Sequence, residues 1–248
     1  ETTNGPDRIG QLRAWLSQAL PKAGLSPDNF TLTPASSDAS FRRYFRVGVA
    51  SGTSLIAMDA PPDKENCAPF IAVARVFRDA GVHVPDLGAQ EIRRGFLLLS
   101  DMGTTTYLDR LLPLRADKGP EAPGAIDALY RDAIASLVDI QRASRVGVLP
   151  EYDRTLLERE LRLLPEWYVR GQLHATLTAS QNATMEAAFE AILKNNLAQP
   201  RVYVHRDYHS RNLMVSTPNP GILDFQDAVH GPITYDLMSL LRDAYIEW

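Results

Sequence analysis

The sequence contains a single cysteine, no basic excess and no long apolar run. Cys67 alone excludes an internal disulfide and a metal site built from several cysteines, and it fits a reducing compartment, so we expect a cytoplasmic protein. The formal net charge of −4 gives no electrostatic case for nucleic acid, because proteins that bind phosphate backbones usually present a basic face. No stretch approaches the roughly eighteen apolar residues of a membrane span. We therefore expect neither a nucleic acid nor a membrane as a partner.

What the sequence does contain suits a globular chain with a sizeable core, since 45% of the 248 residues are hydrophobic. Apolar spacing predicts a helix over residues 9–20, which Pro21 should end. Alternation predicts a three-strand meander over 30–60, and apolar helical spacing predicts a helix over 70–80. The run "GFLLLSDMG" then predicts a buried strand leading to a break. These elements form the first of two expected lobes.

Beyond residue 102 the pattern becomes mainly helical. A polar linker over 113–124 precedes a long predicted helix over 126–140, and helical spacing returns over 154–170 and 181–198. Three short strand-like runs follow: "VYVH", "NLMV" and "GILDF". The sequence thus predicts a mixed α+β fold with a cleft between a lobe of residues 1–102 and a lobe of residues 103–248.

Two of these runs, "NLMV" and "GILDF", flank "STPNP", which favours a turn and hence a hairpin. If Val215 pairs with Gly221, then Asn212 lies opposite Asp224, and directly opposed side chains share a face. An amide oxygen and a carboxylate would then converge. Oxygen ligands of this kind suit Mg²⁺, which takes few protein ligands and completes its octahedron with water and phosphate oxygens.

Asp207 precedes Asn212 by five positions and follows the strand-like "VYVH". Taken alone, His-Arg-Asp usually lies in a surface loop, and an Asp beside a Phe usually caps a strand or helix. Together, at these separations and between two strand-like runs, they match the catalytic loop and metal-binding aspartate of kinase-like phosphotransferases. The predicted reaction is transfer of the ATP γ-phosphoryl group to a hydroxyl, and the predicted fold is the two-lobed, protein-kinase-like fold.

Two longer motifs narrow the prediction. "HRDYHSRN" and "ILDFQDAVHGPITYDLMSL" resemble the H-x-D-x-H-x-x-N loop and the metal segment of the aminoglycoside phosphotransferase and choline kinase branch. An A-P-E segment and a G-x-G-x-x-G loop are absent from the sequence, so a protein kinase is disfavoured.

Within that branch, "SSDASFRRYFRV", "MDAPPDKENCAPF" and "LLERELRLLPEWYV" resemble bacterial anomeric sugar kinases that phosphorylate N-acetylmuramate and N-acetylglucosamine at C1 during peptidoglycan recycling. The resemblance covers almost the whole chain. It implies ATP as cosubstrate, Mg²⁺ as cofactor, a sugar 1-phosphate as product and a downstream uridylyltransferase. We also expect a monomer.

The same resemblance implies roles for residues near the catalytic loop. Asp207 would contact the acceptor and orient or deprotonate its hydroxyl. Asn212 and Asp224 would bind magnesium. His205 and Asp236 are more simply interpreted as structural braces of the loop.

For ATP, the resemblance implies a hinge and a cover. The backbone of Ser100, Asp101 and Met102 would meet adenine at the hinge. The residues expected to cover the phosphates are Ser36, Ser37, Asp38, Ala39 and Ser40. Small side chains there permit close backbone approach, although the loop lacks the glycines that such covers usually contain.

One departure from this fold concerns the third strand, which usually carries a lysine paired with a glutamate of the next helix. Met58 and Asp59 stand there, and residues 68–80 contain no glutamate. Because the triphosphate still needs a cation, Arg42, Arg43 or Lys64 could replace the lysine, and Arg43 is favoured. The alternative is that these arginines simply face solvent.

The acceptor pocket is expected in the second lobe. Glu160 and Trp167 are seven positions apart, which on an α-helix places them on one face, and a carboxylate beside an aromatic ring is a common way to hold a sugar. The alternative for Trp167 is core packing. His209, on the catalytic loop, is the better acceptor contact.

Three competing functions remain at this stage. An aminoglycoside kinase would need a strongly acidic second lobe, and residues 104–248 show no acidic runs. A choline kinase would need an aromatic cage, for which the scattered tyrosines do not argue. A nucleotide-binding pseudokinase is supported by the missing lysine pair.

The family that the sequence resembles usually continues with further helices, so the sequence leaves open whether the native chain extends beyond Trp248.

Overall fold

The computed structural model describes residues 7–36 and 41–248, which divide between two compact units. The first unit is Glu1–Ala133 with Ser210–Gln226, and the second is Ile134–His209 with Asp227–Trp248. These units do not coincide with the expected lobes of residues 1–102 and 103–248. The division into two lobes at residue 102 stays a prediction.

The first unit is built on a five-stranded antiparallel sheet in the order β1-β2-β3-β5-β4. Its strands are β1 (Thr31–Ser36), β2 (Arg43–Gly48), β3 (Ser54–Asp59), β4 (Leu87–Glu91) and β5 (Phe96–Ser100). The predicted meander and buried strand are confirmed. β4 was not predicted, because "LGAQE" has only a half-buried alternation and a glycine that weakens a strand signal.

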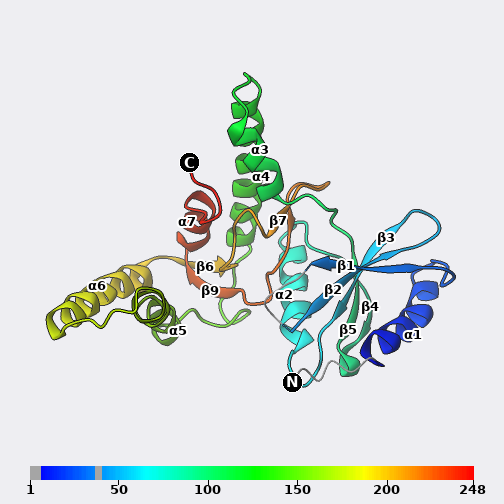
Figure 1. The fold of residues 1–248 in the computed structure, drawn as a ribbon, viewed down its shortest axis with the longest axis horizontal. Coiled ribbons are helices and arrows are strands. Elements are labelled where there is room, and N and C mark those ends of the chain that lie inside the picture. Colours follow the sequence, from blue (N-terminus) through cyan, green and yellow to red (C-terminus); the bar gives the residue numbers. More distant parts are fainter. Residues whose placement is uncertain (1–6, 37–40) are drawn as a thin grey trace. The chain divides into compact units, whose positions relative to one another are not determined.

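Two helices flank this sheet on opposite sides (Figure 1). α1 (Asp7–Lys22) packs its apolar stripe on β2, β3 and β5. Pro21 lies inside its last turn rather than ending it. α2 (Cys67–Asp79) is preceded by the N-cap residue Asn66, whose side chain accepts from the Ala68 N–H and so satisfies one of the free donors of the first turn.

The rest of the first unit corrects the predicted linker. The short η1 (Ile92–Arg94) joins β4 to β5, and α3 (Tyr107–Ala116) follows a capping box formed by Thr106 and Asp109. α3 therefore occupies the first part of the predicted linker, and α4 (Ala122–Arg142) already starts at its end. β7 (Leu213–Met214) and β8 (Gly221–Ile222) form the predicted hairpin.

The second unit contains the end of α4, α5 (Arg154–Leu161), a π-helix η2 (Leu164–Gln172), α6 (Ala179–Ala198) and α7 (Tyr235–Leu241). β6 (Arg201–Val204) pairs antiparallel with β9 (Val229–Pro232). Tyr152, Leu157, Leu193, Val204 and Val229 form a buried cluster between these elements. Over residues 7–36 and 41–248, no helix is both long and apolar enough to span a membrane.

Candidate active site

The predicted metal pair is brought together in the first unit, although by a different register. β7 and β8 pair Leu213 with Ile222, one step away from the predicted register, so Asn212 lies opposite Leu223 and accepts its N–H at 2.9 Å. Asp224 has a φ of +60°, which takes it out of the strand. Its Oδ2 nevertheless accepts from Asn212 Nδ2 at 3.5 Å.

This pair has the donor chemistry that Mg²⁺ needs. The Asp224 carboxylate supplies oxygens, and rotation of the Asn212 amide presents its own oxygen to the same place. Gln226 Nε2 donates to Asp224 Oδ1 at 2.9 Å and orients the carboxylate. Among the described residues no group of three or more His, Cys, Asp or Glu could hold a metal ion. A pair of oxygen ligands is the number that Mg²⁺ often takes from a protein when nucleotide phosphates and water supply the others.

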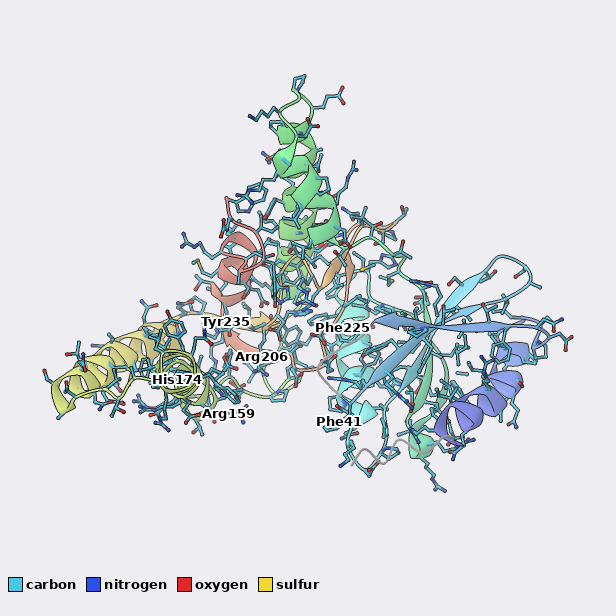
Figure 2. All side chains as sticks on the ribbon, viewed as in Figure 1. Phe41, Arg159, His174, Arg206, Phe225 and Tyr235 are labelled. Carbon is cyan, nitrogen blue, oxygen red and sulfur yellow. The ribbon has the colours of Figure 1, made fainter. Side chains whose placement is uncertain are left out.

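An aromatic anchor fixes the segment that carries Asp224. The Phe225 ring packs on Phe70 and Phe77 of α2, with centroid distances of 4.9 and 5.9 Å. Figure 2 shows Phe225 beside α2. Phe225 is fully buried. The Asp-Phe pair therefore places the carboxylate next to a side chain that cannot easily shift.

In the second unit, the buried carboxyl group of Asp236 holds the start of the predicted catalytic loop. Asp236 accepts from the backbone N–H of His205 at 2.6 Å and of Arg206 at 3.0 Å. The Asp207 N–H in turn donates to His205 Nδ1 at 3.3 Å. The Asp207 side chain belongs to an exposed residue, and His205 is fully buried. This geometry supports the prediction that His205 and Asp236 brace the loop, while Asp207 remains accessible.

The expected hinge follows β5, and its middle residue is tied to the sheet. Asp101 accepts from Arg46 Nε at 2.6 Å, from Ser54 Oγ at 2.5 Å and from the Gly103 N–H at 3.0 Å. Burial alone would raise the pKa of Asp101, but these hydrogen bonds and the Arg46 charge outweigh it and lower the pKa below its usual range. The Asp101 side chain therefore anchors the segment as a carboxylate.

The backbone N–H groups on either side of Asp101 differ in their hydrogen bonds. The Ser100 N–H donates to Asp86 O at 3.1 Å, and Ser100 Oγ accepts from the Asp86 N–H at 2.8 Å. Met102 is buried and lies outside every strand. Its N–H meets no acceptor in the described part of the chain, which suits a backbone contact to a ligand.

Arg43 is not a solvent-facing arginine. Its Nη2 bonds Asp59 Oδ2 at 2.5 Å and its Nε bonds the same oxygen at 3.2 Å. Arg8 of α1 bonds the other oxygen at 2.8 Å, and Asp59 itself is 0% exposed. Because Arg43 lies directly opposite Asp59, it shares the face that α1 covers, whereas Met58 is buried on the other face.

The two other candidate cations lie beside the start of β2. Arg42 Nε lies 3.8 Å from Glu65 Oε2, and Glu65 Oε1 accepts from the Phe41 N–H at 3.2 Å. The Lys64 ammonium lies 5.5 Å from the Phe41 ring centre and forms no ion pair within residues 7–36 and 41–248. Of the predicted cover, Ser36 ends β1, and Ser37, Asp38, Ala39 and Ser40 lie outside the described residues.

The acceptor residues predicted in the second unit have different surroundings. Glu160 accepts from the hydroxyls of Tyr152 and Tyr235, the latter at 3.2 Å, and forms an ion pair with Arg206. Trp167 is 73% exposed, which excludes core packing in the described structure. The prediction that Glu160 and Trp167 share one helix face depends on a continuous α-helix. It is wrong, because Trp167 lies in the π-helix η2, whose hydrogen bonds run from residue i to i+5.

His209 offers a polar group of the kind that an acceptor hydroxyl could use. Its ring meets the Tyr245 ring edge-on at 5.3 Å, and its backbone N–H donates to Asp207 O at 3.1 Å. Its Nδ1 is buried and has no hydrogen-bond partner in the structure as described. A buried ring nitrogen of this kind is costly unless an ordered water or a ligand satisfies it.

Sequence reasoning missed three charged residues of these networks. Asp59 stands where the usual lysine would be, and the sequence gives no sign of the two arginines that bind it. Arg206 lies within His-Arg-Asp, which indicates no partner for its side chain. Arg46 carries no sequence signal for its pairing with Asp101, because that contact joins residues 55 positions apart.

The chain is similar in sequence to known phosphotransferases. A family model described as a phosphotransferase enzyme family matches residues 31–248. An N-acetylmuramate/N-acetylglucosamine kinase from Pseudomonas putida is 49% identical over 248 residues, covering 97% of this chain and 69% of that protein. A kinase of the same name from Neisseria meningitidis is 46% identical, covering 96% of this chain and 67% of that protein.

Solved structures share the fold at low identity. An ADP-bound aminoglycoside phosphotransferase superposes with a TM-score of 0.61 at 16% identity, covering 96% of this chain and 77% of that one. A choline/ethanolamine kinase family protein from Mesorhizobium loti gives a TM-score of 0.60 at 16% identity, covering 94% and 69%. The predicted α+β, protein-kinase-like fold is confirmed.

Proposed function

The chain belongs to the phosphotransferase enzyme family, and from that membership we propose that it is an ATP-dependent kinase of N-acetylmuramate and N-acetylglucosamine that phosphorylates the anomeric hydroxyl. The observation that carries the proposal is the identity of 46–49% with kinases of that name over at least 96% of this chain. Such a kinase would work in the cytoplasm, where ATP is available, as a monomer in cell-wall recycling.

The residues of the catalytic loop suit this reaction. In the proposed step the anomeric hydroxyl oxygen forms a bond to the γ-phosphorus, the bond from that phosphorus to the β,γ-bridging oxygen breaks, and ADP leaves. Asp207 would orient the hydroxyl and accept its proton. Asn212 and Asp224 would hold Mg²⁺, which when bound neutralises charge on the phosphates. The bonds of Asp236 to the backbone support a fixed position for Asp207.

For the nucleotide, the Met102 N–H is the proposed contact to adenine. Of the three candidate cations, Lys64 is the one we propose for the phosphates. The guanidinium of Arg43 is bound to Asp59, and Arg42 lies near Glu65, whereas no carboxylate of the described residues pairs with the Lys64 ammonium.

The acceptor would meet the catalytic loop through His209, whose buried Nδ1 can bond a sugar hydroxyl. Trp167 is sufficiently exposed to offer a ring face to a pyranose. Both assignments are tested by the acceptor KM, which should rise in His209→Ala and Trp167→Ala without a matching fall in kcat.

The experiment that tests the function is ATP-dependent ADP release with N-acetylmuramate, N-acetylglucosamine, kanamycin or choline, each with magnesium. We expect turnover with the two amino sugars only, and ³¹P NMR should show phosphate on the anomeric carbon. Asp207→Asn should abolish turnover, whereas Asp139→Asn, a matched change at an exposed position of α4, should not. Turnover only with kanamycin or choline would overturn the acceptor assignment, and no turnover with any acceptor would favour the pseudokinase.

A further inference from the structure

The backbone immediately before Asp207 adopts an unusual conformation. Arg206 has a φ of +81°, in the left-handed region that residues other than glycine rarely adopt. This conformation is unfavourable for any residue other than glycine and persists only where its surroundings hold it. The neighbours that hold Arg206 therefore also decide where the next residue, Asp207, lies.

Two carboxylates hold Arg206, one at each end of the residue. Asp236 accepts from its backbone N–H at 3.0 Å. Glu160, on α5, forms an ion pair with its guanidinium, and both side chains of that pair are 22% exposed. Arg206 Nη1 also donates to Asp227 O at 3.4 Å. The residue is thus fixed both through its main chain and through its side chain.

Glu160 is itself fixed by two tyrosines. Tyr152 and Tyr235 each donate a hydroxyl to Glu160 Oε2, and their rings pack at a centroid distance of 5.3 Å. The Arg206 guanidinium lies 5.8 Å from the centre of the Tyr152 ring. Figure 2 shows Arg206 and Tyr235 close together. Because Tyr235 directly precedes Asp236 in α7, the same short segment supports both ends of Arg206.

The ionisation of the group agrees with a fixed charge pair. Burial by itself lowers the pKa of Arg206, but the charge and hydrogen bond of Glu160 raise it above the ordinary value. Burial raises the pKa of Tyr235 to about 12, and of Tyr152 further, so both stay protonated donors to Glu160. A buried ion pair is weak evidence for net stability over apolar side chains, so the effect to test is the one on the geometry of the loop.

We propose that Glu160 is a positioning residue for phosphotransfer: through its ion pair with Arg206 it holds the left-handed turn that presents Asp207 to the acceptor hydroxyl. This inference rests on the proposed function and replaces direct acceptor binding as the role of Glu160. A carboxylate already bound by an arginine and two tyrosines has little capacity left for sugar hydroxyls.

The test combines kinetics with backbone hydrogen exchange in Glu160→Gln. Because the substitution removes the charge but keeps the shape, we expect kcat to fall about tenfold while the acceptor and ATP KM values stay within about twofold. The amides of His205 and Arg206, which bond Asp236, should exchange about tenfold faster. The matched control is Glu190→Gln, which removes the exposed pair between Arg154 and Glu190 in the same unit and should change neither quantity.

A second variant guards against misfolding and isolates the side chain. Arg206→Gly tolerates the positive φ but loses the guanidinium, so it should reproduce the kcat loss, and the double variant should lose little more than either single one. A raised acceptor KM with unchanged kcat and exchange in Glu160→Gln would overturn the proposal in favour of acceptor binding. Unchanged values throughout would also overturn it. If the unmodified protein shows no turnover, the proposed function fails, and the exchange result still decides whether Glu160 holds the turn.

Discussion

Asp236 has an environment that ties its protonation to folding. Burial raises its pKa, the N–H groups of His205 and Arg206 lower it, the Asp207 charge raises it, and the result is about 7 against an ordinary 3.8. Between these values the folded state holds a proton that the unfolded chain has lost. The contribution of Asp236 to the free energy of unfolding is therefore full below pH 3.8 and is lost as pH rises through about 7.

We expect Asp236→Asn to remove this dependence. The difference in unfolding free energy between the unmodified protein and the variant should decline between about pH 4 and pH 8, by at most about 4 kcal/mol. Denaturant unfolding at four pH values in this range measures it. Taking the difference removes the contributions of acids elsewhere, such as Asp101, whose lowered pKa acts in the opposite direction. A difference that is constant with pH would contradict the prediction.

Lys64 and Arg43 should respond oppositely to truncation. Loss of the Lys64 ammonium should raise the KM for ATP by about tenfold or more, the usual range for a hydrogen bond to a charged group, with little change in stability. Arg43→Ala should instead lower the unfolding midpoint, because it takes one partner from the fully buried Asp59. Lys118→Ala, at an exposed position between α3 and α4, serves as the control. If Arg43→Ala raises the KM for ATP at unchanged stability, the assignment is reversed.

At the scale of elements, alternation and turn chemistry predicted the sheet core and the β7–β8 hairpin but not the hairpin register. The pairing of Leu213 with Ile222 would point Asp224 away from Asn212 if the strand continued. The positive φ of Asp224 restores the convergence, and that conformation has no signature in the sequence. The candidate metal pair could be predicted because the two residues are close in sequence. Contacts such as Arg8 with Asp59, 51 positions apart, depend on packing that local patterns do not encode.

The junction between η1 and β5 offers a test of close packing between elements. Gly95 has a φ of +72°, and a Cβ placed on it would lie 1.7 Å from Ala60 O, just beyond β3. Gly52 has a φ of +84° with nothing within 4 Å of such a Cβ. Gly52→Ala should therefore cost about 1 kcal/mol for the left-handed backbone alone. Gly95→Ala should cost at least about 3 kcal/mol, since the backbone itself must move. Equal shifts in the urea midpoint would contradict this reasoning.

At the scale of the whole molecule, the sequence predicted the order of sheet and helices but placed the division differently from the compact units. Residues 210–226 belong with the sheet because Phe225 packs on α2 and because Ile222 N–H donates to His83 O at 2.8 Å. Local sequence patterns do not indicate this return of the chain to the first unit, because the contacting residues are far apart in the sequence. The unit boundary thus falls between His209 and Ser210, inside the motif that the sequence presents as one loop.

Nucleotide binding should stabilise the chain most when magnesium is present and the metal pair is intact. At about one hundred times its dissociation constant, a ligand adds about 2.7 kcal/mol, which for a chain of this size raises Tm on the order of 5–10 °C. We expect this rise with ATP and magnesium, and a much smaller one with ATP and EDTA, because the phosphate charge then meets the Asp224 carboxylate without a cation. Asp224→Asn should reduce the magnesium-dependent part, whereas Asp139→Asn should keep it. Differential scanning fluorimetry measures all four cases, and an equal rise with EDTA would remove magnesium from the proposed nucleotide site.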